Sequence, residues 1–122
     1  MPTPTTVLVV DDSRVSRLMA RQYILAAHPD WIVEEATTGE EALQKADALA
    51  PALVIMDVNM PGMGGLQAAE QMRSAHPQLP ISLLTANVQS ATRNRAQELG
   101  IGFVEKPITE ERIAKLLATL DA

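Results

Sequence analysis

Leu53-Val54-Ile55-Met56-Asp57 is a run of apolar residues that ends on a carboxylate. The segment that follows, Val58 to Gly65, contains Pro61 and three glycines. A short apolar run between turn signals is typical of a strand buried on both faces, and the proline and glycines indicate a loop. We therefore expect Asp57 at the carboxyl end of a buried strand, where a ligand can reach it.

The same alternation of strand and helix recurs along the rest of the chain. Further strands are expected at residues 7–10, 31–36, 81–85 and 103–106. Helices are expected to begin near Ser13, Thr38, Leu66, Ser90 and Thr109, where capping residues or glycines precede helical patterns. This order predicts one α/β domain over residues 1–122, with a five-stranded parallel sheet and helices on both faces.

Two helical segments predict which of their faces is buried. In the first helix the predicted inward face consists of Val15, Leu18, Met19, Gln22, Leu25 and Ala26, and in the second it consists of Ala42, Leu43, Ala46 and Leu49. The paired acids Glu34 and Glu35 favour an edge position for the strand at 31–36.

The composition excludes several classes of function. A chain of 122 residues with a net charge of −5 is about one domain long and has no basic stripe for direct nucleic-acid binding. It has no cysteine, which excludes thiol catalysis and thiolate metal sites. No signal peptide or membrane-spanning run is evident, so we expect a cytoplasmic protein that does not contact a membrane.

Polar residues end most of the expected strands. Asp11 and Asp12 follow the first, Asp57 ends the third, Thr85 the fourth and Lys106 the fifth. If the first and third strands are neighbours, three carboxylates converge, and they either raise one another's pKa or bind a cation. An all-oxygen ligand set favours Mg²⁺. With Lys106 and Thr85 beside it, Asp57 is a candidate nucleophile for a phosphoryl group.

These residues fall in four motifs that together resemble the receiver domain of two-component response regulators, of the stand-alone, CheY-like type. The matching segments are Val7–Ser13, Met56–Pro61, Leu84–Ala86 and Glu105–Pro107. Each motif alone is weak, whereas all four in this order are specific. The resemblance implies a flavodoxin-like (βα)5 fold with the strand order 2-1-3-4-5, and it covers about the whole chain.

The resemblance also implies a phosphorylation site. Asp57 matches the phosphoacceptor. Asp12 and Asp57 would bind Mg²⁺ through their side chains, Asn59 through its backbone carbonyl and Asp11 through a water molecule. The phosphoryl group would come from a histidine kinase or a histidine phosphotransfer protein, as in a phosphorelay, and the domain would catalyse only its own phosphorylation and dephosphorylation.

The remaining matches imply a conformational switch. Lys106 would contact the phosphoryl group, and the Lys106–Pro107 bond would be cis. Thr85 would move toward the phosphoryl group, and Phe103 would turn into the space that Thr85 leaves. The changed surface would lie around the helix at 90–99, the strand at 103–106 and the last helix, and would bind a downstream protein that the sequence does not identify.

Two other functions are considered. One is an interaction module that binds its partner without phosphorylation. The other is a Mg²⁺-dependent phosphatase with an aspartyl nucleophile, but such enzymes use a second acid two residues later, where this chain has Asn59. A flavin site is weaker still, because no phosphate-binding loop is present.

Two further features of the sequence bear on partners and stability. Gly64 stands where the family often has Asp, so the third helix lacks a carboxylate cap. Arg14, Arg17 and Arg21 on the first helix suggest that it meets an acidic partner surface.

Overall fold

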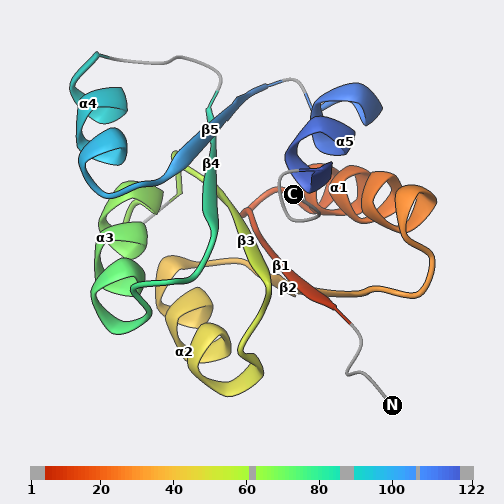
Figure 1. Cartoon of the computed structure of the whole chain (residues 1–122), viewed down its shortest axis with the longest axis horizontal. Coiled ribbons are helices and arrows are strands. Elements are labelled where there is room, and N and C mark those ends of the chain that lie inside the picture. The colour runs from red at the N-terminus through yellow and green to blue at the C-terminus, as the bar shows by residue number, and fades with distance from the viewer. Residues whose placement is uncertain (1–4, 61–62, 86–89, 107, 119–122) are drawn as a thin grey trace.

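The structure is a computed structural model, and it describes residues 5–60, 63–85, 90–106 and 108–118. Strands and helices alternate along the chain (Figure 1). They are β1 (Thr6–Val10), α1 (Arg14–Ala27), β2 (Ile32–Ala36), α2 (Gly39–Leu49), β3 (Leu53–Asp57), α3 (Gly65–Ala75), β4 (Ile81–Thr85), α4 (Ser90–Glu98), β5 (Gly102–Glu105) and α5 (Glu110–Ala118). The predicted alternation is confirmed.

All five strands are parallel and lie in the order β2-β1-β3-β4-β5, as the resemblance implies. Helices α1 and α5 cover one face of the sheet, and α2, α3 and α4 cover the other (Figure 1). Every residue of β3 is buried, as expected for a strand with helices on both sides. The strand with paired acids, β2, lies at one edge, as predicted.

Two hydrophobic clusters fill the spaces between the sheet and its helices. The cluster under α2, α3 and α4 includes Leu8, Val54, Met56, Met72 and Leu83. The cluster under α1 and α5 includes Val9, Ile24, Ile55, Leu84 and Ile113. Consecutive residues of β3 thus belong to opposite clusters, which fixes the register of the strand and the position of its last residue, Asp57.

The prediction that Val15 and Leu18 lie on the buried face of α1 is wrong. Val15 is 65% exposed and Leu18 is 51% exposed, whereas Ala20 and Ile24 are fully buried. Apolar residues occur around much of this helix, so the sequence pattern alone does not select one face. Small Ala20 allows close approach to the sheet, and this packing turns the Val15 and Leu18 side toward solvent.

Smaller differences occur at the ends of elements. Leu49, predicted inward, is 39% exposed at the last residue of α2. The strand β5 ends at Glu105, one residue before Lys106. Ser13 and Thr38 cap α1 and α2 through their hydroxyl groups, and Gly64 precedes α3 without a side-chain cap, all as predicted.

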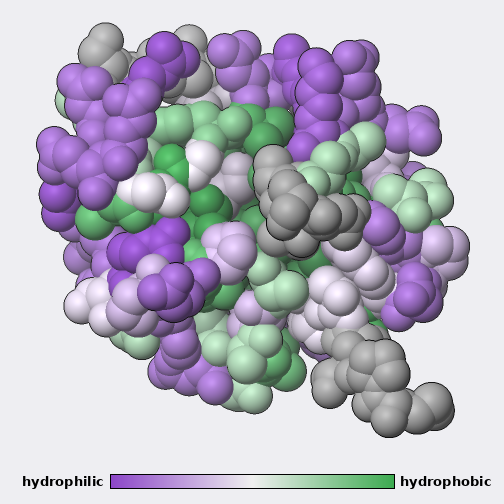
Figure 2. All heavy atoms as spheres, in the orientation of Figure 1, coloured by the Kyte–Doolittle hydropathy of each residue, from purple (hydrophilic) through white to green (hydrophobic). Residues whose placement is uncertain are grey.

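The helix α4 has a mostly polar surface. Figure 2 shows hydrophilic side chains over α4 and α5, with apolar residues between them. Within α4, Ala96 is buried and the residues around it are mostly exposed.

Among the residues that the structure describes, no helix is long and apolar enough to cross a membrane.

Candidate phosphorylation site

The sheet brings the acidic residues of two separate strands to one edge. Strand β3 lies between β1 and β4, with Val10 opposite Met56 and Asp57 opposite Leu84. The carboxyl ends of the parallel strands therefore meet, and Asp11 directly follows β1 beside Asp57. The convergence predicted from the strand tips is confirmed.

Asp11, Asp12 and Asp57 form one acidic cluster. Each offers a carboxylate oxygen within 4.8 Å of the others. Asp11 is fully buried, Asp57 is 3% exposed and Asp12 is exposed. The cluster is thus open to solvent at Asp12, while the other two carboxylates are held inside the fold.

The environment of Asp57 works against its negative charge. Burial raises the pKa of the Asp57 carboxyl, and the nearby Asp11 carboxylate raises it further. The backbone N–H of Asn59, which donates to Asp57 Oδ1 at 3.2 Å, and the ammonium group of Lys106 lower this pKa in part. The remaining repulsion between carboxylates is what a bound cation would relieve.

Lys106 joins the two buried carboxylates from the far side of β4. Its Nζ lies 3.3 Å from Asp57 Oδ1 and 3.4 Å from Asp11 Oδ2. Its backbone N–H donates to the Thr85 carbonyl at 2.8 Å, which fixes the chain just after β5. The structure therefore places the ammonium group where it can offset negative charge on a group attached to Asp57.

The donor set of the cluster fits a magnesium ion. Carboxylate oxygens are hard ligands, and Mg²⁺ is commonly held by one or two carboxylates together with waters and a phosphate oxygen. Asp12 is exposed, which suits an ion that keeps part of its water shell. After burial, the Asp11 carboxylate is the next cause that raises the pKa of Asp57, and a cation bound between the two carboxylates would offset this repulsion.

A close backbone contact explains one glycine that the sequence analysis did not single out. A Cβ on Gly65 would lie 2.1 Å from the carbonyl oxygen of Asp57, while a Cβ on Gly64 would meet nothing closer than 3.7 Å. The N–H of Gly65 donates to the Val58 carbonyl at 3.0 Å. The start of α3 thus packs directly against the backbone of Asp57, and only the Gly-Gly pair in the sequence signals it.

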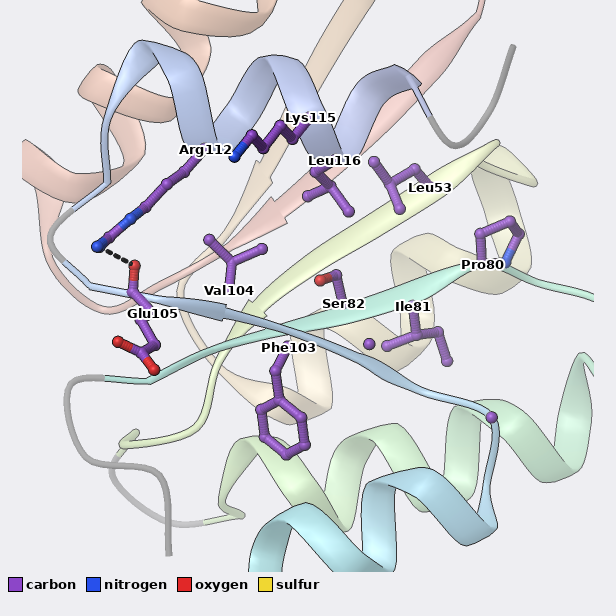
Figure 3. A pocket seen from close by; sticks show the side chains of 12 residues that line it. Leu53, Pro80, Ile81, Ser82, Phe103, Val104, Glu105, Arg112, Lys115 and Leu116 are labelled. Carbon is purple, nitrogen blue, oxygen red and sulfur yellow. Dashed lines mark hydrogen bonds between the residues drawn. The ribbon is translucent and has the colours of Figure 1, made fainter. Parts of the chain in front are cut away.

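The proposed switch residues lie on neighbouring strands. Thr85 is buried at the end of β4, beside β3. Phe103 is half-buried on β5 and packs against the cluster under α2, α3 and α4. Figure 3 shows its ring on the opposite side of β5 from Arg112 and Leu116. Their predicted movements stay predictions, and Pro107, with the expected cis bond, lies outside the described residues.

A cavity of about 550 Å³ opens between β5 and α5, away from the acidic cluster (Figure 3). Its walls include Leu53, Ser82, Val104 and Leu116. Arg112 at its rim donates to the Glu105 carbonyl at 2.7 Å. This cavity lies on the surface that, by the resemblance, would bind a downstream protein, and not beside the expected phosphorylation site.

The comparisons with known proteins agree with the site. The profile of the response regulator receiver domain matches residues 7–118. The chemotaxis protein CheY of Thermotoga maritima is 34% identical over 112 residues, covering 91% of this chain and 92% of CheY. The solved structure of CheY4 from Vibrio cholerae, at 32% identity, has a TM-score of 0.87 and covers 97% of this chain and 99% of that one.

Other relatives are much longer than the region they share with this chain. The sensor protein EvgS of Escherichia coli is 33% identical over 121 residues, but the match covers 10% of its length. The response regulator GacA of Pseudomonas syringae is 36% identical over 101 residues, which cover 47% of its length. Matches over the shared region, the strand order and the acidic cluster agree, and the chain belongs to the response regulator receiver domains of two-component signalling.

Proposed function

We propose that this domain accepts a phosphoryl group on Asp57 from the phosphohistidine of a histidine kinase or a phosphotransfer protein. The observation that carries the proposal is the buried Asp57 carboxylate, which has two further carboxylates within 4.8 Å and the Lys106 ammonium 3.3 Å away. A nucleophile, a place for a cation and a fixed positive charge are the parts that phosphoryl transfer requires.

The transfer is a substitution at phosphorus. A carboxylate oxygen of Asp57 attacks the phosphorus, a new P–O bond forms, and the P–N bond to the donor imidazole breaks. The imidazole leaves with the electron pair of that bond and takes up a proton. Lys106 stabilises the negative charge on the phosphoryl oxygens, and the Asn59 N–H keeps the carboxylate in position.

The acidic cluster would hold Mg²⁺ during this step. In the proposal Asp12 and Asp57 bind the ion through their side chains, Asn59 through its carbonyl and Asp11 through a water molecule. When bound, Mg²⁺ supplies positive charge that offsets the charge of the phosphoryl oxygens.

Phosphorylation would change the binding surface formed by α4, β5 and α5. The new group on Asp57 would draw the Thr85 hydroxyl toward it, and Phe103 would turn inward into the vacated space. The phosphoryl group can shift this equilibrium only as far as it stabilises one state more than the other. The mostly exposed α4 and the half-buried β5 support this location, because little packing opposes their movement.

The donor protein would dock on the exposed side of α1. Val15 and Leu18 are exposed there, and Arg14 lies beside them at the start of the helix. This helix begins at Arg14, two residues after Asp12, so a partner bound to it would reach the acidic cluster. An apolar patch rimmed by positive charge suits a helical partner with an acidic surface.

A phosphatase remains disfavoured on the described geometry. Asn59 meets Asp57 through its backbone N–H, and an amide side chain at this position cannot supply a proton as a general acid. We therefore propose a signalling module whose chemistry is confined to its own phosphorylation and dephosphorylation.

The test uses acetyl phosphate as a small phosphodonor. The wild type, incubated with Mg²⁺ and acetyl phosphate, should gain the mass of one phosphoryl group, and acetate leaves. Asp57→Asn should gain none, and adding a chelator should prevent the gain in the wild type. Undiminished labelling of Asp57→Asn would contradict the assignment, and a folded wild type that binds Mg²⁺ but gains no mass would favour the phosphorylation-independent module.

A further inference from the structure

The side chain of Arg17 is more buried than those of the other arginines of α1. Its side chain is 14% exposed, whereas that of Arg21, one turn later, is 45% exposed. Arg14 at the start of the helix is also exposed. A guanidinium group is withdrawn from water only where hydrogen bonds replace those it loses. Arg17 is therefore held by specific partners and is not part of a general positive surface.

The guanidinium group of Arg17 joins two separate strands. Its Nη1 donates to the backbone carbonyl of Asp11 at 2.8 Å, just beyond β1. Its Nε donates to Glu35 Oε1 on the edge strand β2 at 2.9 Å. Lys45 of α2 in turn donates to the carbonyl of Glu35. Arg17 thus connects the acidic turn to a strand that is held in place from the other side.

The carbonyl that Arg17 holds belongs to the peptide group between Asp11 and Asp12. The other bonds of Asp11 fix different atoms: its N–H donates to the Ala36 carbonyl at 3.1 Å, its Oδ1 accepts from the Ser13 N–H at 2.9 Å, and its Oδ2 accepts from Lys106 Nζ at 3.4 Å. The orientation of the Asp11–Asp12 peptide sets the direction in which the exposed Asp12 side chain leaves the backbone. Arg17 therefore acts on Asp12, the one member of the acidic cluster whose side chain is exposed.

We infer that Arg17 is a positioning residue for cation binding by the acidic cluster, and that Glu35 acts through Arg17. Arg17 holds the Asp11–Asp12 peptide so that the carboxylates of Asp12 and Asp57 face a common point. Glu35 keeps the guanidinium group in the orientation that reaches the Asp11 carbonyl. The inference rests on the proposed function, because it concerns the same cation.

The sign of the effect separates positioning from simple charge. Arg17 is a positive group near a site for a positive ion, so its charge alone weakens Mg²⁺ binding. If charge were all that mattered, removing Arg17 would strengthen binding. If Arg17 positions Asp12, removing it weakens binding, because the carboxylates lose their common direction. The two accounts predict opposite changes from one substitution.

The experiment measures Mg²⁺ affinity by titrating the folded protein and following the backbone amides of the acidic cluster by NMR. Arg17→Met replaces the arginine with an unbranched apolar side chain that resembles its stem, and so removes the guanidinium group. We expect it to weaken Mg²⁺ binding about 10-fold, the lower end of the effect of residues that orient metal ligands. At saturating Mg²⁺, labelling by acetyl phosphate should return close to the wild-type rate, which a general loss of structure would not allow.

Arg21→Met is the matched control. Arg21 lies on the same helix and also pairs with Glu35, at 3.4 Å, but no described contact joins it to Asp11. It should leave Mg²⁺ affinity within about 2-fold of the wild type. Glu35→Ala should weaken binding in the same direction as Arg17→Met, and the double variant should be no weaker than Arg17→Met alone, because Glu35 acts through Arg17.

Each result decides between the accounts. Unchanged or tighter Mg²⁺ binding by a folded Arg17→Met protein overturns the inference and leaves the proposed function intact. Additive losses in the double variant overturn the part assigned to Glu35. A folded wild type that binds no Mg²⁺ overturns the proposed function and this inference with it. Urea unfolding of every variant shows that the titrations compare folded proteins.

Discussion

Strands β3 and β5 belong to one sheet but are built differently. All five residues of β3 are buried, and it pairs with a strand on each side. Strand β5 lies at the edge, with Gly102 and Glu105 exposed and Phe103 and Val104 half-buried. The proposed phosphoacceptor Asp57 ends the buried strand, and the proposed switch residue Phe103 lies on the exposed one. In the proposed function, phosphoryl transfer takes place on the buried strand, and the conformational response takes place on the more exposed one.

Lys106 connects these two regions. It follows β5, yet its ammonium group reaches Asp57 on β3 and Asp11 after β1. A change in charge on Asp57 therefore acts directly on the segment after β5. In the proposed function, Lys106 is the contact through which phosphorylation of Asp57 would affect the edge of the sheet.

The largest effect should come from crowding the backbone of Asp57. In Gly65→Ala the added Cβ would lie 2.1 Å from the Asp57 carbonyl oxygen, and backbone on both sides would have to move. We expect a loss of at least about 3 kcal/mol in the free energy of unfolding, measured with urea, and slower labelling by acetyl phosphate.

Gly64→Ala is the control for that substitution. It makes the same chemical change one residue earlier, where a Cβ would have 3.7 Å to the nearest atom. It should cost about 0.5–1 kcal/mol, because alanine is a poorer helix cap than glycine. Equal losses at both positions would show that α3 is not packed on Asp57 as the structure describes.

The second prediction compares truncations in the two strands. Ile55 is fully buried in β3, so Ile55→Ala should lower the free energy of unfolding by about 3–4 kcal/mol. Val104→Ala on β5 should cost about 1 kcal/mol, because the side chain is half-buried beside a cavity and has less contact to lose. Similar losses would mean that β5 is as firmly packed as β3, against the proposed division between them.

The division between what the sequence predicted and what it missed has a physical basis. Apolar runs that end on Asp11, Asp57 and Thr85 are local patterns, and parallel strands must bring their ends together. Which side of α1 faces the sheet depends instead on tertiary packing around Ala20. The bond from Arg17 to the Asp11 carbonyl depends in addition on where β2 places Glu35. Sequence spacing alone carries no signal for such contacts between elements.

The smallest predicted effect tests the electrostatic state of the buried acid. Because the pKa of Asp57 in the folded protein is raised above its ordinary value of 3.8, the folded state favours the protonated carboxyl. The resulting stability is fully present below pH 3.8 and is lost as pH rises through the raised pKa. At neutral pH, with Mg²⁺ removed by a chelator, Asp57→Asn should therefore unfold at a higher urea concentration than the wild type. The difference should shrink as pH falls.

Two additions make this measurement decisive. Asp30→Asn, which makes the same change from carboxylate to amide at an exposed residue between α1 and β2, is the matched control. Mg²⁺ should stabilise the wild type more than Asp57→Asn, because the variant lacks one of the carboxylates whose repulsion a bound cation offsets. A wild type more stable than Asp57→Asn at neutral pH without Mg²⁺ would mean that Lys106 and the Asn59 N–H outweigh burial. These two groups would then offset the charge of the cluster without a cation. Mg²⁺ would be needed only to offset the charge of the incoming phosphoryl group.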